Sequence, residues 1–255
     1  MLQDGGPSAD RIVFVGHSTV LIELDGARLL TDPVLRARVA HLRRGTEPVE
    51  VEPPAIDAVL ISHLHHDHLD TPSLRLLGTG TRMVLPAGAG AWLRRRRFEA
   101  VTELGTGDAT GVGALTVTAV AARHDGRRHP GGRRAAALGY LVRGSRSIYF
   151  AGDTELFGEM EQLAGGLDVA LVPVAGWGSK LGPGHMDPLD AARAVRLLRP
   201  RVAIPIHWGT LFPRVGGRRL RERAEEPPRL FAEHVARLAP GTEVRILSPG
   251  QQTTL

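Results

Sequence analysis

One short stretch, residues 63–68, restricts what this chain can fold into more than any other. It reads His-Leu-His-His-Asp-His, follows an apolar and β-prone run at residues 58–61, and precedes a predicted helix at residues 71–77. Imidazole and carboxylate groups are common zinc ligands, and a turn lets alternate side chains converge on one ion while later ones reach a second. The run therefore predicts a two-metal site rather than a solvated loop, with four candidate ligands: His63, His65, Asp67 and His68.

Metal-competent residues also follow other strand-like segments at their ends. Outside the histidine-rich run, these residues are Asp32, His124, Asp153 and His207. Loops at one edge of a sheet are where α/β folds collect their chemistry, so we expect these ends to meet. The set suits two divalent ions, one held by His63, His65 and His124 and the other by Asp67, His68 and His207, with Asp153 bridging. Two ions about 3.5–4 Å apart can activate a shared water and stabilise the leaving oxygen of a hydrolysed ester.

The apolar pattern along the rest of the chain predicts a strand-rich α/β fold. Expected strands cover residues 11–15, 20–24, 27–31, 56–62, 82–85, 100–104, 114–121, 138–143, 147–151, 168–172, 202–206 and 243–247. Expected helices cover residues 71–77, 87–97, 155–164, 188–198 and 228–238. We interpret residues 33–55, 123–136, 176–186 and 211–227 as loops. The whole chain, residues 1–255, is expected to form one domain.

Composition limits the chemistry further. The chain has no cysteine, which excludes disulfides and thiolate zinc sites, so nitrogen and oxygen must hold any metal. Its formal net charge is +5, and nearly all basic residues are arginine, with Lys180 the only lysine. An arginine-rich stretch at residues 123–134 surrounds His124, where we expect a positive rim that attracts anionic substrates. No apolar run approaches the ~20 residues that span a bilayer and residues 1–10 do not read as a signal peptide, so a cytoplasmic protein is expected.

The run at residues 63–68 resembles the H-x-H-x-D-H signature of the metallo-β-lactamase superfamily. Further along the chain, His124, Asp153 and His207 resemble the later motifs of that superfamily in their order, and the similarity covers most of the chain. The resemblance implies a four-layer αββα sandwich with a dinuclear site at the edge between two sheets. It also implies a metal-bound hydroxide as the nucleophile.

Narrower motifs resemble one branch of the superfamily, which contains the N-acyl-phosphatidylethanolamine phospholipase D and the L-ascorbate-6-phosphate lactonase. These motifs lie at residues 16–18, 31–33, 152–154, 184–188 and 205–210, the last reading Pro-Ile-His-Trp-Gly-Thr. Classical β-lactamases and glyoxalase-type thioesterases lack that ending. In the phospholipases an aromatic residue commonly follows the third histidine, whereas Asp125 follows His124 here. This departure argues against a lipid substrate more than against the metal site.

Residues near the predicted ligands have expected roles of other kinds. His185 lies between a glycine-rich loop and a helix start and is the candidate general acid, and Asp67 is counted with it as catalytic. Asp32 is expected to orient a ligand imidazole through a hydrogen bond. His17, Trp177 and Trp208 are expected to line the pocket or to pack beside it. His66 is expected to point away from the ions, and His129 is an alternative to His124 as a ligand.

The sequence thus predicts a metal-dependent hydrolase that uses a metal-bound hydroxide on an anionic ester, either a phosphodiester or a lactone. Two alternatives stay open, a nuclease of the same superfamily and a metal-binding protein without turnover. Two divalent ions are the expected cofactors; Zn²⁺ suits nitrogen and oxygen ligands first, Mn²⁺ is compatible with them, and iron is also open. The expected partner is a small anionic molecule rather than nucleic acid, no membrane span is expected, and the oligomeric state is left open.

Overall fold

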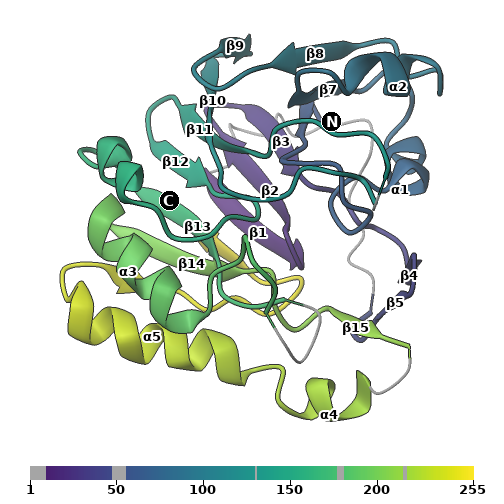
Figure 1. Cartoon of the computed structure of the whole chain (residues 1–255). Coiled ribbons are helices and arrows are strands. Elements are labelled where there is room, and N and C mark those ends of the chain that lie inside the picture. Colours follow the sequence, from purple (N-terminus) through teal and green to yellow (C-terminus); the bar gives the residue numbers. More distant parts are fainter. Residues whose placement is uncertain (1–9, 48–55, 130, 177–180, 215–216) are drawn as a thin grey trace, which may run out of the picture.

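Two seven-stranded sheets face each other in the computed structural model, which describes residues 10–47, 56–129, 131–176, 181–214 and 217–255 (Figure 1). In the first sheet, three antiparallel strands near the N-terminus are followed by three further strands, which run parallel to the third. A strand from the C-terminal end completes its edge. The spatial order is β17 (Gln252–Thr254), β1 (Arg11–Gly16), β2 (Thr19–Leu24), β3 (Ala27–Thr31), β6 (Ala58–Leu60), β7 (Arg82–Pro86) and β8 (Val101–Leu104).

The second sheet is also mixed. Its four strands from residues 109–150 form an antiparallel meander, and the remaining strands pair in parallel. Its order is β16 (Glu243–Val244), β14 (Val202–Ile206), β13 (Val169–Pro173), β12 (Ser147–Phe150), β11 (Leu138–Arg143), β10 (Leu115–Ala121) and β9 (Ala109–Val112).

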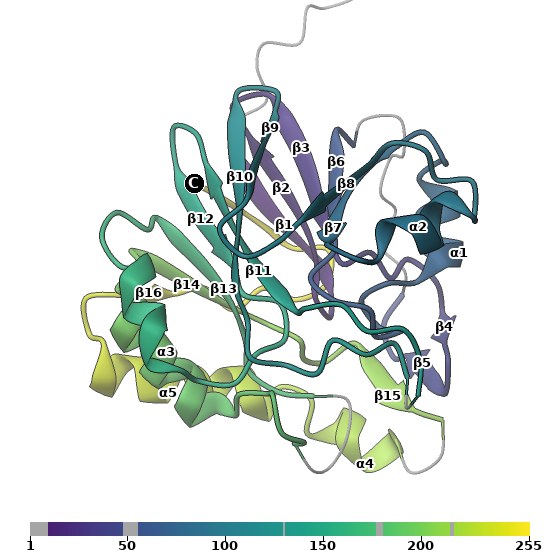
Figure 2. The same cartoon turned by 45° about the horizontal axis from the view of Figure 1, so that its top comes forward.

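Helices cover the outer face of each sheet. The helices α1 (Thr71–Leu76) and α2 (Gly90–Arg94) lie on the first sheet, and α3 (Pro188–Leu198) and α5 (Glu226–Leu238) lie on the second (Figure 2). Asp187 caps α3, because its carboxylate accepts from the backbone N–H groups of Leu189 and Asp190. The prediction of a four-layer αββα sandwich is confirmed. Among the described residues, no helix has both the length and the apolar character needed to cross a bilayer.

Apolar side chains from both sheets fill the space between them. Ile12 and Phe14 of β1 meet Val117 of β10 and Tyr140 of β11 in one fully buried cluster. Removal of this apolar surface from water is the main favourable term in such a fold. The hydroxyl of Tyr140 is not left unpaired, since it donates to the backbone oxygen of Ile61 at 2.7 Å. This bond holds the chain in place just before the histidine-rich run.

A third, small sheet lies where loops were expected. The strands β4 (Arg38–Val39) and β5 (Leu42–Arg44) form a hairpin, and β15 (Leu211–Pro213) pairs with β5. The helix α4 (Gly217–Glu222) follows. The prediction of loops over residues 33–55 and 211–227 is therefore wrong for these elements. Strands of two or three residues show no readable period, and the β5–β15 pairing joins segments that are far apart in the chain.

Other predicted elements are shorter in the structure. Residues 155–164, expected to be helical, contain only the 3-10 helix η2 (Gly158–Leu163), which begins without a side-chain cap. The helix expected at residues 87–97 is reduced to α2, and the strand expected at residues 243–247 is reduced to β16. Gly158 begins η2, which has no side-chain cap, and Gly88 and Gly90 lie at the start of the other expected helix. Glycine weakens a helix, and so does the missing cap of η2.

Strand ends from both sheets meet at one edge of the sandwich. Asp32 directly follows β3, and His207 directly follows β14. The backbone N–H of His207 donates to the backbone oxygen of His17 at 2.7 Å, which ties the end of β14 to the β1–β2 turn. His17, Asp32 and His207 all have positive φ angles, of 57°, 34° and 62°. Residues with a Cβ rarely adopt this conformation, and such strain tends to concentrate at functional sites.

Candidate metal centre

One fully buried carboxylate, that of Asp32, orients two of the predicted ligands. Its Oδ2 accepts from Nδ1 of His68 at 2.7 Å and from Oγ of Ser62 at 2.5 Å. Because the Ser62 hydroxyl donates to Asp32, it accepts from Nδ1 of His63, 3.0 Å away. Both imidazoles therefore carry a proton on Nδ1 and, when neutral, present an unprotonated Nε2. This is the orienting contact that the sequence led us to expect of Asp32.

Backbone oxygens orient two further imidazoles in the same sense. Nδ1 of His124 donates to the oxygen of Gly184 at 2.8 Å, and Nδ1 of His207 donates to the oxygen of Ala175 at 2.8 Å. Each ring then has Nε2 free to bind a metal. Gly184 has a φ of +77°, and a Cβ at this position would lie 2.8 Å from Nδ1 of His124. A glycine is therefore required for the loop to approach His124 so closely.

Three imidazole nitrogens form the first ligand group. Nδ1 of His65 lies 3.0 Å from Nε2 of His63 and 3.0 Å from Nε2 of His124. The structure thus brings together the three residues predicted to share one ion. Two come from the histidine-rich run after β6, and the third comes from the loop after β10.

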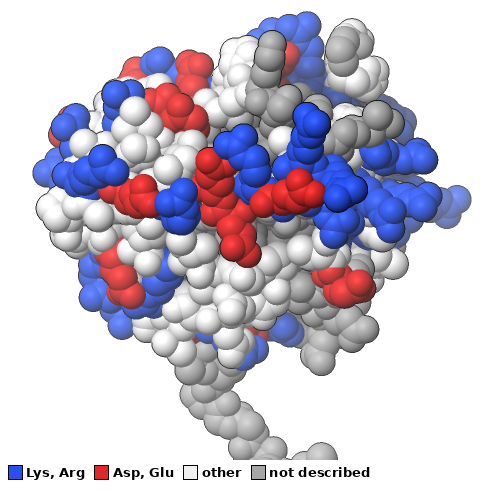
Figure 3. Space-filling view, turned by 90° about the horizontal axis from the view of Figure 1, so that it is seen from below, with Lys and Arg blue, Asp and Glu red and all other residues white. Residues whose placement is uncertain are grey.

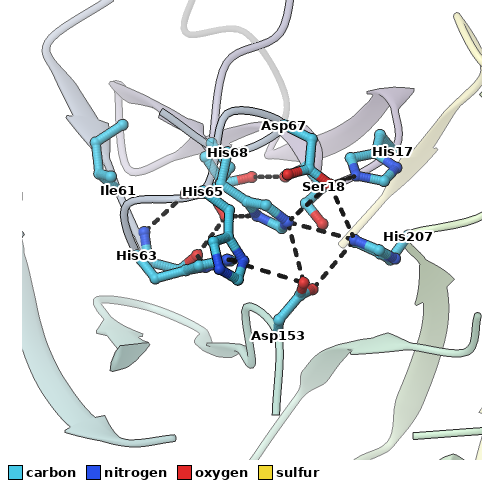
Figure 4. A network of polar contacts seen from close by, with 12 residues as sticks. His17, Ser18, Ile61, His63, His65, Asp67, His68, Asp153 and His207 are labelled. Atoms are coloured by element: carbon cyan, nitrogen blue, oxygen red, sulfur yellow. Dashed lines mark hydrogen bonds and ion pairs between the residues drawn. The ribbon is translucent and has the colours of Figure 1, made fainter. Parts of the chain in front are cut away.

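The second group contains one residue more than predicted. Nε2 of His68 lies 3.3 Å from Nε2 of His207, and Oδ2 of Asp67 lies 3.8 Å from His68 and 4.0 Å from His207 (Figure 4). Nε2 of His17 joins them, 3.2 Å from Oδ2 of Asp67. His17 is buried and was expected only to line the pocket or pack beside it. Its donor atom lies within the same group as the three predicted ligands.

Asp153 lies between the two groups, as Figure 4 shows. Its Oδ2 is 3.2 Å from Nε2 of His68 and 3.9 Å from Nε2 of His63, while Oδ1 is 3.3 Å from Nε2 of His207. Oδ1 is buried and makes no hydrogen bond within the described structure. A buried oxygen of this kind normally has a partner, so its position favours a bound cation.

Gly152 allows this position of Asp153. Gly152 has a φ of +61°, and a Cβ there would lie 2.6 Å from Cβ of Ser62. No side chain could be accommodated at that separation without displacing the strand end that carries Ser62. The Gly-Asp pair after β12 is therefore needed to bring the carboxylate between the two groups.

His185, the candidate general acid, also contacts Asp153. Its Nε2 lies 3.4 Å from Oδ2 of Asp153, and its side chain is 21% exposed. Burial lowers the pKa of His185, but the hydrogen bond and charge of Asp153 outweigh this effect and raise the pKa overall. A partly exposed imidazole with a raised pKa is suited to donate a proton.

The protonation states of Asp153, His17 and His124 fit divalent metal ions. In contrast, burial would lower the pKa of His68, but the charges of Asp153, Asp32 and Asp67 outweigh burial and raise this pKa well above its ordinary value. Burial would raise the pKa of Asp153, but the neighbouring imidazoles of His207 and His68 hold it well below its ordinary value. Burial lowers the pKa of His17 to about 3 and that of His124 to about 4. Ionised carboxylates beside neutral imidazoles are the form that binds a metal. Nitrogen atoms bound at 2.0–2.1 Å to one tetrahedral zinc would lie about 3.4 Å apart, close to the separations found here.

Comparison with known families agrees with this geometry. The family described as the β-lactamase superfamily domain matches residues 27–208, which include all but one of the residues in the two ligand groups. The chain belongs to this superfamily. The match extends from β3 to the residue after His207 and so covers the greater part of both sheets.

Several relatives of this chain are named as hydrolases. The chain is 35% identical to a UPF0173 metal-dependent hydrolase of Methanopyrus kandleri, over 94% of this chain and 98% of that protein. It is 29% identical to the N-acyl-phosphatidylethanolamine-hydrolyzing phospholipase D 1 of Caenorhabditis elegans, over 77% of this chain and 63% of that protein. The solved structure of Igni18, a metallo hydrolase of Ignicoccus hospitalis, has a TM-score of 0.74 at 22% identity and covers 97% of this chain and 99% of its own, which shows the shared fold. The chain is therefore a metal-dependent hydrolase of the metallo-β-lactamase fold.

Two arginines of the arginine-rich stretch of this hydrolase pair with acidic side chains. Arg123 pairs with Glu159 at 3.0 Å, and Arg127 pairs with Asp125 at 3.2 Å. Such exposed pairs offset part of the local charge, although each contributes little to stability. The attraction of an anionic substrate to this stretch stays a prediction from the sequence.

Arg128, in the same stretch, holds the histidine-rich run in place. Its Nη1 donates to the backbone oxygens of Leu64 and Leu69, each at 2.9 Å. Its Nη2 donates to Nδ1 of His66 at 3.1 Å, so His66 is turned toward Arg128 and lies outside the ligand groups. The guanidinium lies 4.7 Å from the centre of the Trp92 ring on α2. One side chain thus joins both ends of the metal-binding run to the helix layer.

A cavity of about 240 Å³ adjoins the second ligand group. His17 and His207 line it, and most of the remaining wall is apolar, including Leu181, Trp208 and Phe212. Trp208 also stacks on Phe14 with ring centres 5.9 Å apart, so it serves both the cavity wall and the core. The cavity offers space for an apolar substituent beside the metal centre.

Two further predicted residues are not placed in the site. Trp177 lies outside the described residues. His129 is exposed and belongs to neither ligand group, whereas His124 lies in the first. The geometry therefore favours His124 over His129 as the third nitrogen beside His63 and His65.

The sequence did not indicate that Arg128 supports the histidine-rich run or that Ser62 orients a ligand. Ser62 could have been found, because a hydroxyl directly before the first ligand is within reach of that ligand's ring. Arg128 had no comparable signal. Its two carbonyl partners are 64 and 59 positions away in the chain, and the arginines around it have other partners.

Proposed function

We propose that this protein is a dinuclear metal-dependent hydrolase that cleaves an anionic ester, either a phosphodiester or a lactone. The observation that carries the proposal is the position of Asp153 between two groups of ligand atoms. The first group is His63, His65 and His124, and the second is Asp67, His68 and His207 with His17 beside them. When bound, two divalent ions would activate a water at neutral pH and polarise the ester. Zn²⁺ suits these ligands first, and Mn²⁺ is compatible with them.

The residues of the chain have separate tasks in this proposal. Asp153 holds the two ligand groups in a fixed relation. Asp32 orients the ring of His68 directly and that of His63 through the hydroxyl of Ser62. His185 supplies a proton to the leaving oxygen, which is supported by its contact with Asp153 and its partial exposure. Asp67, with its carboxylate directed at His17, His68 and His207, positions the attacking group in the second half of the site.

The cavity supports a substrate with an apolar part next to the scissile bond. The name of the Caenorhabditis elegans relative describes hydrolysis of a phosphodiester that carries acyl chains, which favours the phosphodiester over the lactone. The anionic character of the substrate, the absence of nucleic acid among the partners and a cytoplasmic location stay predictions from the sequence.

The test is hydrolysis of a chromogenic phosphodiester and of a chromogenic lactone by protein loaded with Zn²⁺ or Mn²⁺. We expect turnover of at least one ester, with the phosphodiester faster. Asp153→Ala should lower kcat/KM by more than about 100-fold, beyond the 10–100-fold that loss of a ligand-orienting group costs. Asp108→Ala is the matched control, because among the described residues its carboxylate accepts only from the N–H of Gly105, in a turn before β9.

The same protein should contain two metal ions per chain by elemental analysis. Two bound ions with no hydrolysis of either ester would favour the metal-binding protein without turnover. Full activity in Asp153→Ala would show that the two ligand groups do not depend on this carboxylate.

A further inference from the structure

A second, strongly basic pocket lies away from the ligand groups. It has a volume of about 310 Å³ and lies between β5, β15 and α4. Gly45, Phe212 and Pro213 line it together with five arginines and one carboxylate. These charged residues are Arg43, Arg44, Arg214, Arg218, Arg221 and Glu222. Figure 3 shows basic side chains gathered on the right-hand side of the molecule, the side on which these elements lie in Figure 1.

Only part of this positive charge is compensated. Arg218 pairs with Glu222 at 3.1 Å, and Nη2 of Arg221 donates to the backbone oxygen of Gly45 at 2.9 Å. Neither Arg43 nor Arg214 has an acidic partner among the described residues. Like charges held around one hollow repel each other, and an anion in the hollow would relieve this repulsion.

One arginine of this pocket is buried. Arg44 is 5% exposed, and its Nη atoms donate to the backbone oxygens of Val15 and Val34 at 3.3 and 2.6 Å. Its Nε is buried and has no hydrogen-bond partner in the described structure. Because Arg44 has no acidic partner among the described residues, its charge adds to the positive potential of the pocket.

The number and type of donors indicate the class of ligand. Planar guanidinium groups match the oxygen atoms of a phosphate or a carboxylate with two parallel hydrogen bonds, and several arginines around one hollow favour the more highly charged phosphate. The pocket also shares Phe212 with the cavity beside the metal centre, so a ligand in it would lie next to that cavity without contacting the ligand groups. We propose that this basic pocket binds a phosphate-type oxyanion separately from the metal centre.

The proposal can be tested by calorimetric titration with pyrophosphate as the probe. The full chain is compared with Arg43→Ala/Arg214→Ala, because these two arginines have no acidic partner in the described structure. We expect the Kd to rise about tenfold or more for the double variant, since hydrogen bonds to charged groups are among the stronger ones. Arg193→Ala/Arg237→Ala is the matched control, because it removes the same charge from exposed positions on α3 and α5.

Asp153→Ala separates the basic pocket from the metal centre. We expect pyrophosphate binding in this variant to retain its sensitivity to Arg43→Ala/Arg214→Ala. Loss of all binding in Asp153→Ala would overturn the proposal, because the anion would then bind only at the metal centre. Equal weakening by the control pair would also overturn it, because a diffuse charge effect would then explain the result.

A parallel arm identifies the source of the phosphate. Vesicles containing phosphatidic acid are compared with vesicles of neutral lipid in a sedimentation assay, with the same variants. Arginine-dependent binding to the anionic vesicles would assign the pocket to a lipid headgroup. Arginine-dependent binding of pyrophosphate alone would assign it to a soluble phosphorylated molecule, and either result supports recognition of phosphate.

Discussion

At the scale of single residues, the positions of the predicted ligands depend on side chains outside the two ligand groups. Arg128 is the clearest case, since it bonds the backbone oxygens of Leu64 and Leu69 and so spans the run that carries four predicted ligands. Burial and the nearby charge of Arg96 lower the pKa of Arg128 to about 10, so it stays protonated at neutral pH. Its charge-assisted hydrogen bonds therefore persist under working conditions.

We predict that Arg128→Ala weakens metal binding by about 10–100-fold, the range seen when groups that orient metal ligands are removed. Arg128→Lys keeps the charge but loses the planar fork, so it should recover only part of the affinity. Metal affinity is measured by competition with a chromogenic chelator. Arg133→Ala is the control from the same stretch, because within the part of the chain that the structure describes the Arg133 side chain donates only to the backbone oxygen of Gly88. Unchanged affinity in Arg128→Ala would show that the run holds its geometry alone.

At the scale of elements, a strand supplies the missing cap of a helix. The N-cap residue of α2, Ala89, makes no side-chain hydrogen bond. Instead Oε1 of Glu103, on β8, accepts from the backbone N–H groups of Gly88 and Gly90 at 2.8 and 2.9 Å, and Oε2 pairs with Arg94 at 3.1 Å. The helix α2 carries Trp92, whose ring packs against the guanidinium of Arg128. The Glu103 carboxylate therefore supports the metal-binding run indirectly, through α2 and Arg128.

We predict that Glu103→Gln lowers the free energy of unfolding at pH 7 by about 1 kcal/mol, the contribution of a typical cap or hydrogen bond. Burial would raise the pKa of Glu103, but its bonds to Gly90, Arg94 and Gly88 outweigh this and lower it. A lowered folded-state pKa gives stability that is present above the unfolded value of about 4.3 and is lost as the pH falls through the folded value.

The difference between wild type and Glu103→Gln should therefore shrink as the pH falls below about 4.3, as measured by urea unfolding at a series of pH values. Glu99→Gln is the control, an exposed glutamate just before β8. A difference that stays constant from pH 7 to acid would contradict the role of the Glu103 charge.

At the scale of the whole molecule, the metal centre joins the two sheets. His63, His65 and His68 follow a strand of the first sheet, whereas Asp153 and His207 follow strands of the second. An ion bound by residues of both sheets binds the folded chain and not the unfolded one. Metal binding should therefore stabilise the fold as a unit.

We predict that chelation lowers the Tm of the metal-loaded protein by roughly 5–10 °C. Free metal at 100 times its Kd contributes about 2.7 kcal/mol, and each kcal/mol changes the Tm of a protein of this size by about 2–4 °C. The Tm is measured by differential scanning calorimetry with and without chelator. Asp153→Ala should show a smaller decrease, since it removes the carboxylate between the groups. An equal Tm in both conditions would mean that the centre does not couple the sheets.

The sequence by itself determined which residue types form the site and where most of the strands and helices lie. Ligand residues directly follow apolar strands, and both features are local, so residues 63–68, Asp153 and His207 could be recognised without a structure. Caps such as Asp187 are local in the same way. The four-layer sandwich followed from the resemblance of these motifs to a known superfamily.

Only the tertiary structure decided how distant segments support one another. The inclusion of His17 in the second ligand group, the bonds from Arg128 and the pairing of β5 with β15 all join residues far apart in the chain. The arginines of the basic pocket are likewise drawn from β5, β15 and α4. Such contacts leave no period or spacing in the sequence, because they arise only after the two sheets have packed.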